Sequence, residues 1–107
     1  MTTTPPPPPV LPADLQAAVK RLQGWALAWH PQHRTPCLYK AWTLPHFDAA
    51  VQRFHQIAQQ AQAQDHHPEV LSSHTRLEVR IWTHDTHGLT HKDVLLAQAI
   101  DTLDGDA

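Results

Sequence analysis

The sequence predicts an α+β domain built in two layers, a four-stranded antiparallel sheet with three helices on one face, in the order α-β-β-α-β-β-α. Three observations predict this class. Apolar residues recur at helical spacing in three stretches, near residues 12–23, 45–67 and 90–103. Between these stretches, apolar residues alternate with polar or small ones, which is typical of strands. Glycine and proline separate the stretches, as they do at turns.

In the first third of the domain, the sequence pattern predicts a helix followed by a hairpin of two strands. Pro12 suits the first turn of the helix and Gly24 suits its end. The apolar positions of this helix share one face and are Leu15, Ala18, Val19 and Leu22. Alternation then predicts strands at 25–29 and 38–44, joined by a loop at 31–36 that begins and ends with proline. We expect these two strands to pair antiparallel.

A second helix begins after Pro45 and must end before Pro68, because the residue preceding a proline is pushed out of helical geometry. Its apolar residues form one stripe, comprising Phe47, Ala50, Val51, Phe54, Ile57, Ala58 and Ala61. His66 and His67 therefore fall at its C-terminal end, where backbone carbonyls lack partners within the helix.

In the last part of the chain, the sequence pattern predicts a short strand at 69–72, a longer strand at 74–83 and a final helix to Leu103. Three aliphatic residues of the longer strand point to the core. The opposite face is expected to be solvated or available to a partner, and it carries Arg76, Glu78, Arg80 and Trp82. Gly88 allows a turn, and Thr90 is a good helix N-cap with Asp93 three residues on, as in a capping box.

Composition limits the classes of function. The 107 residues carry a net charge of −2 with histidines neutral, so the chain lacks the basic excess of a nucleic-acid or bilayer surface. No apolar run in the sequence approaches the roughly 20 residues that span a membrane. The single cysteine, Cys37, excludes an internal disulfide and fits a reducing compartment. We therefore expect a cytoplasmic protein that binds neither nucleic acid nor membrane.

A change in composition divides the chain into a proline-rich tail at residues 1–10 and one domain at residues 11–104. The tail contains five consecutive prolines, which lack the backbone N–H and hold φ at about −65°. We expect an extended, disordered tail. The alternative is a docking segment for a proline-binding partner.

Histidine is the residue type that suggests chemistry. His66 and His67 end the second helix, and His84 follows the long strand, so three imidazoles line one pocket if the fold brings these ends together. Histidine exchanges protons near neutrality because its unperturbed pKa is about 6.5. We predict acid–base chemistry on a bound organic molecule. Six other histidines are expected to be surface residues: His30, His33, His46, His55, His87 and His91.

A zinc site is the first alternative, because three histidines are spaced three and four residues apart: His84, His87 and His91. Gly88 and the predicted cap at Thr90 interrupt any helix through these positions, and the sequence has no cysteine pair or HExxH motif. We therefore predict no metal. Cys37 lies in a predicted strand without a base near it in sequence, which disfavours nucleophilic catalysis.

Six short motifs between about Leu15 and Leu103 form a recognisable set: Gly24-Trp25, Lys40-x-Trp42-x-Leu44-x-x-Phe47, His66-His67-Pro68-Glu69, Thr83-His84-Asp85, Gly88-Leu89-Thr90 and Asp93. With these motifs the sequence resembles the pterin-4a-carbinolamine dehydratase family. The resemblance implies a two-layer α/β fold, commonly dimeric or tetrameric. It also implies dehydration of 4a-hydroxytetrahydropterin to quinonoid dihydropterin, without a metal or an organic cofactor.

The resemblance also implies roles for individual residues. His66, His67 and His84 would form the acid–base and binding set. The substrate-binding residues would be Trp82 at the flat pterin ring, with Asp85, Pro68 and Glu69. Asp93 belongs to the family pattern, although helix capping is its expected role here.

Two departures from the family pattern concern supporting residues. Four residues before His66 the family usually carries an ionisable residue, often an acid, and this chain has Gln62. Positions i and i+4 share a helix face, so Gln62 would face His66 and could hydrogen-bond to it but could not hold its proton by charge. An aromatic residue is expected at position 74, where this chain has His74, which would thin the apolar wall of the pocket.

These departures sustain a rival prediction. Some proteins that resemble the dehydratases lack the activity and act as Rubisco assembly factors in bacteria that build α-carboxysomes. Others in the broader family act as coactivators of a homeodomain transcription factor. The proline tail and the exposed strand face with Arg76, Glu78 and Arg80 are compatible with a binding role. In the assembly-factor case the partners would include Rubisco subunits and the protein would be associated with the carboxysome.

Overall fold

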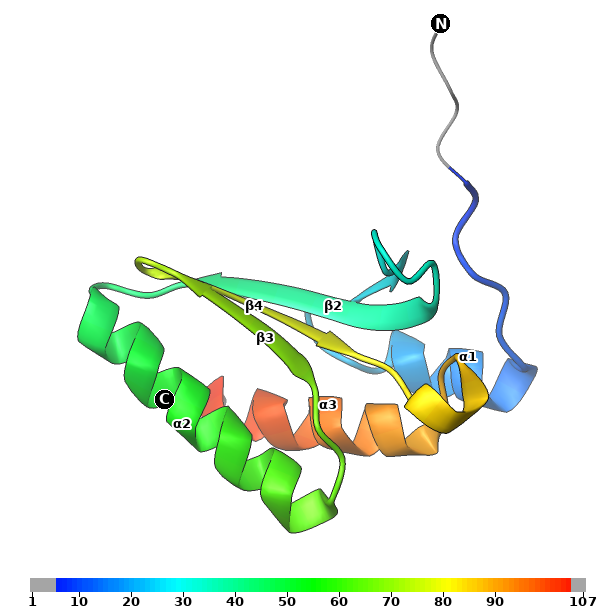
Figure 1. The fold of residues 1–107 in the computed structure, drawn as a ribbon. Helices are drawn as coiled ribbons and strands as arrows, with labels where there is room; N and C mark the ends of the chain where they lie inside the picture. Colours follow the sequence, from blue (N-terminus) through cyan, green and yellow to red (C-terminus); the bar gives the residue numbers. More distant parts are fainter. Residues whose placement is uncertain (1–5, 105–107) are drawn as a thin grey trace, which may run out of the picture.

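A computed structural model of the protein describes residues 6–104. Its elements, in chain order (Figure 1), are α1 (Ala13–Lys20), β1 (Ala26–Trp29), β2 (Pro36–Thr43), α2 (Phe47–Gln64), β3 (Glu69–Ser73), β4 (Arg76–Ile81), the short 3-10 helix η1 (His84–Thr86) and α3 (His91–Asp104). The predicted α+β class and the predicted order of helices and strands are confirmed. Within residues 6–104, no helix combines the length and the apolar character needed to cross a membrane.

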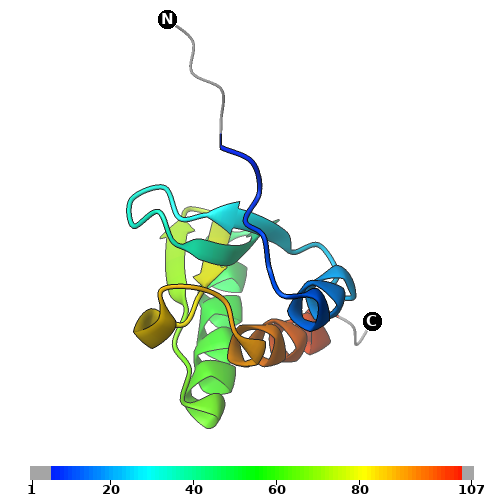
Figure 2. The same ribbon diagram turned by 90° about the vertical axis from the view of Figure 1, so that its right-hand side faces the viewer.

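The four strands form one antiparallel sheet in the order β1-β2-β4-β3. Figures 1 and 2 show the three helices together on one face of this sheet. Pairing places Leu27 opposite Leu38 and Leu38 opposite Ile81, so apolar residues lie in rows across the strands. The core between the layers consists of Leu15, Val19, Trp25, Leu38, Ile57, Ala61, Leu77, Val79, Ile81, Val94, Leu96, Ala97 and Ile100.

Helix α2 ends in a Schellman motif. Asp65 has a left-handed backbone with φ of 50°, and its N–H donates to the carbonyl of Gln62 at 3.2 Å. The N–H of His66 donates to the carbonyl of Ala61 at 3.0 Å. These bonds satisfy carbonyls that the end of a helix leaves open. Because the chain leaves the helix axis at Asp65, His66 and His67 lie on the extended segment that leads into β3.

Only part of the apolar stripe of α2 packs into the core. Ala50 and Ile57 are fully buried, whereas Phe47, Val51 and Phe54 are 56%, 48% and 40% exposed. We call these three exposed residues the α2 patch. A patch of large apolar side chains on one helix is typical of a contact surface.

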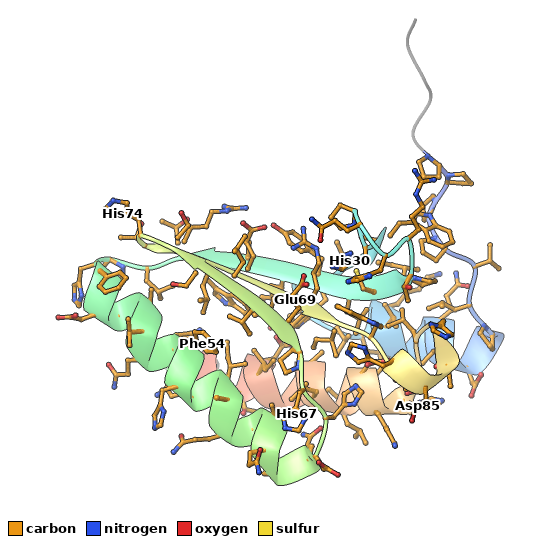
Figure 3. All side chains as sticks on the ribbon, in the orientation of Figure 1. His30, Phe54, His67, Glu69, His74 and Asp85 are labelled. Atoms are coloured by element: carbon orange, nitrogen blue, oxygen red, sulfur yellow. The ribbon has the colours of Figure 1, made fainter. Side chains whose placement is uncertain are left out.

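A two-residue turn joins β3 to β4 and changes the predicted place of His74. His74 has φ of 58°, and Ser73 pairs with Arg76 across the turn. The prediction that the strand begins at residue 74 is therefore wrong. Tight hairpin turns require left-handed backbone, and this turn contains no glycine that would have indicated it. Figure 3 shows His74 at the end of the hairpin remote from His67, so His74 cannot support a pocket at that histidine.

The sheet face opposite the helices carries paired polar groups. The Tyr39 hydroxyl donates to Glu78 Oε1 at 2.8 Å, and the Arg80 guanidinium lies 4.7 Å from the centre of the Tyr39 ring. The prediction that Trp82 is solvated on this face is wrong, because Trp82 is 7% exposed. Its ring lies 5.0 Å from the ring of His30, which belongs to the loop between β1 and β2. That loop covers the end of β4, an arrangement that strand alternation does not encode.

An ion-pair network connects α3 to the sheet. Asp101 Oδ1 accepts hydrogen bonds from Trp25 Nε1 at 2.8 Å and from Lys40 Nζ at 3.0 Å. Both charged side chains are mostly buried, so Asp101→Asn weakens two hydrogen bonds where water replaces them poorly. We expect the free energy of unfolding, measured in urea, to fall by about 1–3 kcal/mol. Asp85→Asn, at an exposed position, is the control and should change it by less than about 0.5 kcal/mol. An equal loss in both variants would contradict this role of Asp101.

Candidate functional site

A cavity of about 310 Å³ lies where the end of α2 meets the segment that follows β4. Its lining consists of Asp65, His66, His67, Thr83, His84, Asp85 and Lys92. The three histidines singled out in the sequence therefore border one cavity, which we call the histidine cavity. Figure 3 shows His67 and Asp85 at this end of the molecule, on the two segments that form its walls.

Asp93 joins the histidine cavity to the start of α3. It is fully buried, and its Oδ1 lies 2.5 Å from His66 Nε2. Its Oδ2 accepts the backbone N–H of Thr90 at 2.8 Å and the hydroxyl of Thr83 at 2.9 Å. Thr90 Oγ1 also accepts the N–H of Lys92 at 3.3 Å. The predicted capping contact between Thr90 and Asp93 is present, and the same carboxylate also holds a histidine of the cavity.

This contact sets the tautomer of His66. An ionised carboxylate only accepts hydrogen bonds, so the proton of a neutral imidazole that faces Asp93 lies on Nε2. The lone pair of Nδ1 then remains available for proton exchange. A histidine bonded in this way to a carboxylate has the geometry that general-base chemistry requires.

Gln62 contacts His67 rather than His66. Its Oε1 lies 3.2 Å from His67 Nε2. The expectation that Gln62 and His66 face each other is wrong, because α2 ends at Gln64 and the turn at Asp65 takes His66 off the helix. The carboxylate partner of His66 comes instead from α3, far away in sequence. A neutral residue at position 62 therefore leaves His66 with a charged partner.

His84 borders two adjoining cavities. Besides the histidine cavity, it lines a cavity of about 430 Å³ together with His33, Thr35, Trp82 and His87. The rings of His84 and Trp82 lie 4.8 Å apart at an angle of 42°. Trp82, predicted to border the substrate, thus contacts His84 directly and lines the adjoining cavity.

The other residues predicted to bind substrate lie in different parts of the structure. Asp85 lines the histidine cavity. Pro68 lines a mostly apolar cavity of about 400 Å³ beside α2, which shares His67 with the histidine cavity. Glu69 Oε1 accepts a hydrogen bond from His30 Nε2 at 3.0 Å and lies 3.9 Å from Arg80. The structure therefore places Glu69 in a link between β3 and the loop after β1, outside the lining of the histidine cavity.

His30 is not the surface residue that we predicted, because it is 2% exposed. Within residues 6–104, the one group whose ligand atoms lie close enough for a metal ion is His30, His33 and Glu69. His30 Nδ1, however, accepts the backbone N–H groups of Gln32 and His33, at 3.1 and 3.0 Å. The ring proton therefore lies on Nε2, where it is donated to Glu69. A metal at Nε2 would have to displace that proton, so this bonding pattern favours a structural role.

The histidines of the zinc alternative do not converge within the described part of the chain. His91 Nε2 lies 3.2 Å from Asp14 of α1. His87 has a left-handed backbone and closes η1, on the far side of Gly88 from His91. Spacing along the sequence suggested a ligand set that the turn at Gly88 separates.

Burial raises the pKa of the Cys37 thiol to about 11. The thiolate is the reactive form, so we expect the native protein to be inert toward Ellman's reagent at pH 8 and the urea-unfolded chain to react rapidly. Because the folded state holds the thiol proton more tightly, the free energy of unfolding has its full value below about pH 8.5, the pKa of an unfolded thiol. It falls as the pH rises from there toward 11. Equal rates for native and unfolded protein would contradict the burial of Cys37.

Thr83 and Lys92, two residues that line the histidine cavity, were not among the predicted site residues. Thr83 donates to Asp93 and lines the histidine cavity, and its place directly before His84 was a usable signal. Lys92 adds a positive charge to the lining, and it has no sequence signal beyond its place next to Asp93.

Comparison with known proteins places this chain in a family. The family described as pterin 4 alpha carbinolamine dehydratase matches residues 8–103. A protein from Rhizorhabdus wittichii, provisionally named pterin-4-alpha-carbinolamine dehydratase, is 35% identical over 75 residues, covering 70% of this chain and 77% of that protein. A Bordetella avium protein with the same provisional name is 36% identical over 91 residues, covering 85% of this chain and 81% of that protein.

Two solved structures share the fold. A transcriptional coactivator/pterin dehydratase from Brucella melitensis has a TM-score of 0.76 at 23% identity and covers 88% of this chain and 96% of that chain. A pterin dehydratase-like protein identified as a RuBisCO assembly factor in the α-carboxysome has a TM-score of 0.62 at 15% identity, covering 79% and 94%. At these identities the likeness shows the fold alone. The family match over nearly the whole described chain, together with relatives above 30% identity, shows that this chain belongs to the pterin-4-alpha-carbinolamine dehydratase family.

Proposed function

We propose that the protein dehydrates 4a-hydroxytetrahydropterin to quinonoid dihydropterin by histidine acid–base catalysis. The observation that supports this most strongly is the presence of His66, His67 and His84 around one cavity, with His66 bonded to the buried Asp93. In the reaction, an acid protonates the hydroxyl at C4a and a base takes the proton from N5. The C4a–N5 double bond forms as water leaves, so the protein needs only to move protons.

The geometry suggests a division of roles. His66, with Nε2 bonded to Asp93, would take the N5 proton at Nδ1. His84, on the opposite wall of the cavity, would protonate the leaving hydroxyl while in its imidazolium form. His67, held by Gln62, would hydrogen-bond the polar edge of the ring. General acid and general base steps each contribute typically about 10²–10⁴ in rate.

The experiment that tests this function compares the wild-type protein with buffer. Carbinolamine is generated freshly in the assay, and the appearance of quinonoid dihydropterin is followed by absorbance. We expect the protein to accelerate dehydration well above the spontaneous rate without added metal or organic cofactor. A wild-type rate equal to that of buffer would end the enzymatic proposal.

We also propose that the protein forms homodimers or homotetramers. The α2 patch supports this, because Phe47, Val51 and Phe54 offer an apolar surface that the single chain leaves exposed. Sedimentation of the purified protein would test it, and a purely monomeric species at micromolar concentration would contradict it.

A second candidate function is a non-catalytic role in Rubisco assembly, with carboxysome association. Two observations favour it: the neutral Gln62 in place of an ionisable residue, and the exposed α2 patch. Its test is co-expression with Rubisco subunits. A higher yield of assembled Rubisco, together with a wild-type dehydration rate equal to buffer, would select this role. An unchanged yield would exclude it.

A further inference from the structure

The N-terminal proline segment contacts the folded domain. Residues 5–9 are five consecutive prolines, and the structure describes this run from Pro6 onward. Trp29 Nε1–H donates a hydrogen bond to the carbonyl of Pro7 at 2.7 Å, and Pro9 is buried. Figures 1 and 2 both show this segment running past the end of the sheet where β1 leads into β2.

The surface around Trp29 has the features of a polyproline site. Trp29 is the last residue of β1 and is 38% exposed. A mostly apolar cavity of about 520 Å³ lies beside it, lined by Pro6, Trp29, His30, Pro31 and Arg34. A polyproline II helix has no internal hydrogen bonds, so its carbonyls are free to accept them. Aromatic grooves recognise such helices by packing on the proline rings while polar groups bond the carbonyls.

This surface is separate from the histidine cavity. The lining residues of the two cavities have no member in common. Binding at Trp29 therefore does not require the proposed reaction, and it need not alter it.

Charge indicates what kind of segment would bind better than the chain's own. Arg34 is exposed and contributes its positive charge to the lining of the cavity. The first acidic residue of the chain is Asp14, which lies in α1 after the proline run. The chain's own prolines therefore bring no carboxylate in line with Arg34. A proline-rich segment that carries an acidic residue next to its prolines would add a charge-assisted contact there.

We propose that Trp29, Pro31 and Arg34 form a binding site for a proline-rich segment of another protein, with acidic residues flanking the prolines. The chain's own segment contacts this site in cis, through the bond from Trp29 to Pro7 and through Pro6 in the cavity lining. A tethered segment acts at an effective concentration on the order of millimolar. If the cis segment alone binds the site with a dissociation constant of about 100 μM, it weakens the binding of any competing ligand roughly tenfold.

The test uses full-length protein labelled with ¹⁵N, with the indole N–H signal of Trp29 as the readout. The ligand is a synthetic peptide of five prolines followed by two acidic residues. Matched peptides replace the acids with lysines, or the prolines with a glycine-serine repeat. One variant carries Pro6→Gly, Pro7→Gly and Pro8→Gly to weaken the cis contact, and a second adds Trp29→Phe, which keeps a ring but removes the donor.

We expect the acidic proline peptide to shift the Trp29 signal and to bind the triple-glycine variant about tenfold more tightly than the wild type. The lysine peptide should bind several-fold more weakly than the acidic peptide. Trp29→Phe should lower the affinity for the acidic peptide at least fivefold. This variant has no indole signal at position 29, so its binding is followed through the backbone signals of neighbouring residues. Equal affinity for wild type and triple-glycine variant would overturn cis occupancy. No shift with the proline peptides, or the same shift with the glycine-serine peptide, would overturn the site itself.

Discussion

Replacing His66 or His84 with alanine is expected to lower the turnover of 4a-hydroxytetrahydropterin by about 10²–10⁴-fold in each case. Each variant removes one of the two proton-transfer groups that we assign to opposite walls of the histidine cavity. Water can replace an imidazole as a proton carrier, but it is not held in place, and its pKa is far from the neutral pH at which an imidazole exchanges protons. Steady-state and single-turnover rates of quinonoid dihydropterin formation measure the loss.

His55→Ala is the matched control. His55 is an exposed histidine within α2 and lines none of the cavities described above, so its loss should leave turnover unchanged. Both active-site variants should retain the far-ultraviolet circular dichroism of the wild type. If turnover in His66→Ala and His84→Ala equals that of His55→Ala, the assignment of these groups fails.

Asp93→Asn is expected to lower turnover by about 10²-fold or more and the free energy of unfolding by about 1–3 kcal/mol. The asparagine amide can donate to His66 Nε2, which would move the neutral ring proton to Nδ1. Nδ1 would then no longer accept a proton from N5. The ¹⁵N shifts of the His66 ring report this change of tautomer directly.

Two variants separate the effects of Asp93 on catalysis from those on folding. Thr90→Val removes the hydroxyl that caps α3 but keeps the contact between Asp93 and His66, so it should cost stability without changing the tautomer. Asp85→Asn removes a carboxylate that lines the same cavity and should leave the His66 tautomer unchanged. A His66 ring that keeps its proton on Nε2 in Asp93→Asn would contradict the proposed role.

The order of elements could be predicted because it depends on local patterns. Helix α2 follows from the apolar repeat between two prolines, and β4 follows from Leu77, Val79 and Ile81 at alternate positions, all three fully buried. The start of α3 follows from Thr90 and Asp93, whose side chains and backbone groups bond within one turn. In each case the information lies within a few residues.

The partners of the site residues depend on contacts between distant segments. Asp93 reaches His66 across 27 positions of sequence, and Glu69 reaches His30 across 39. Helix periodicity predicted Gln62 as the partner of His66, because it assumes that the helix continues through that residue. The left-handed turn at Asp65 ends the helix before that point.

Binding of a tetrahydropterin, followed by the ring ¹³C and ¹⁵N signals of the histidines, tests the central claim most directly. If three imidazoles surround one flat ring, the signals of His66, His67 and His84 will shift together at the same ligand concentration, while that of His55 stays in place. A shift confined to one of the three, or no shift at saturating pterin, would show that these rings do not share a ligand and would contradict the proposed site.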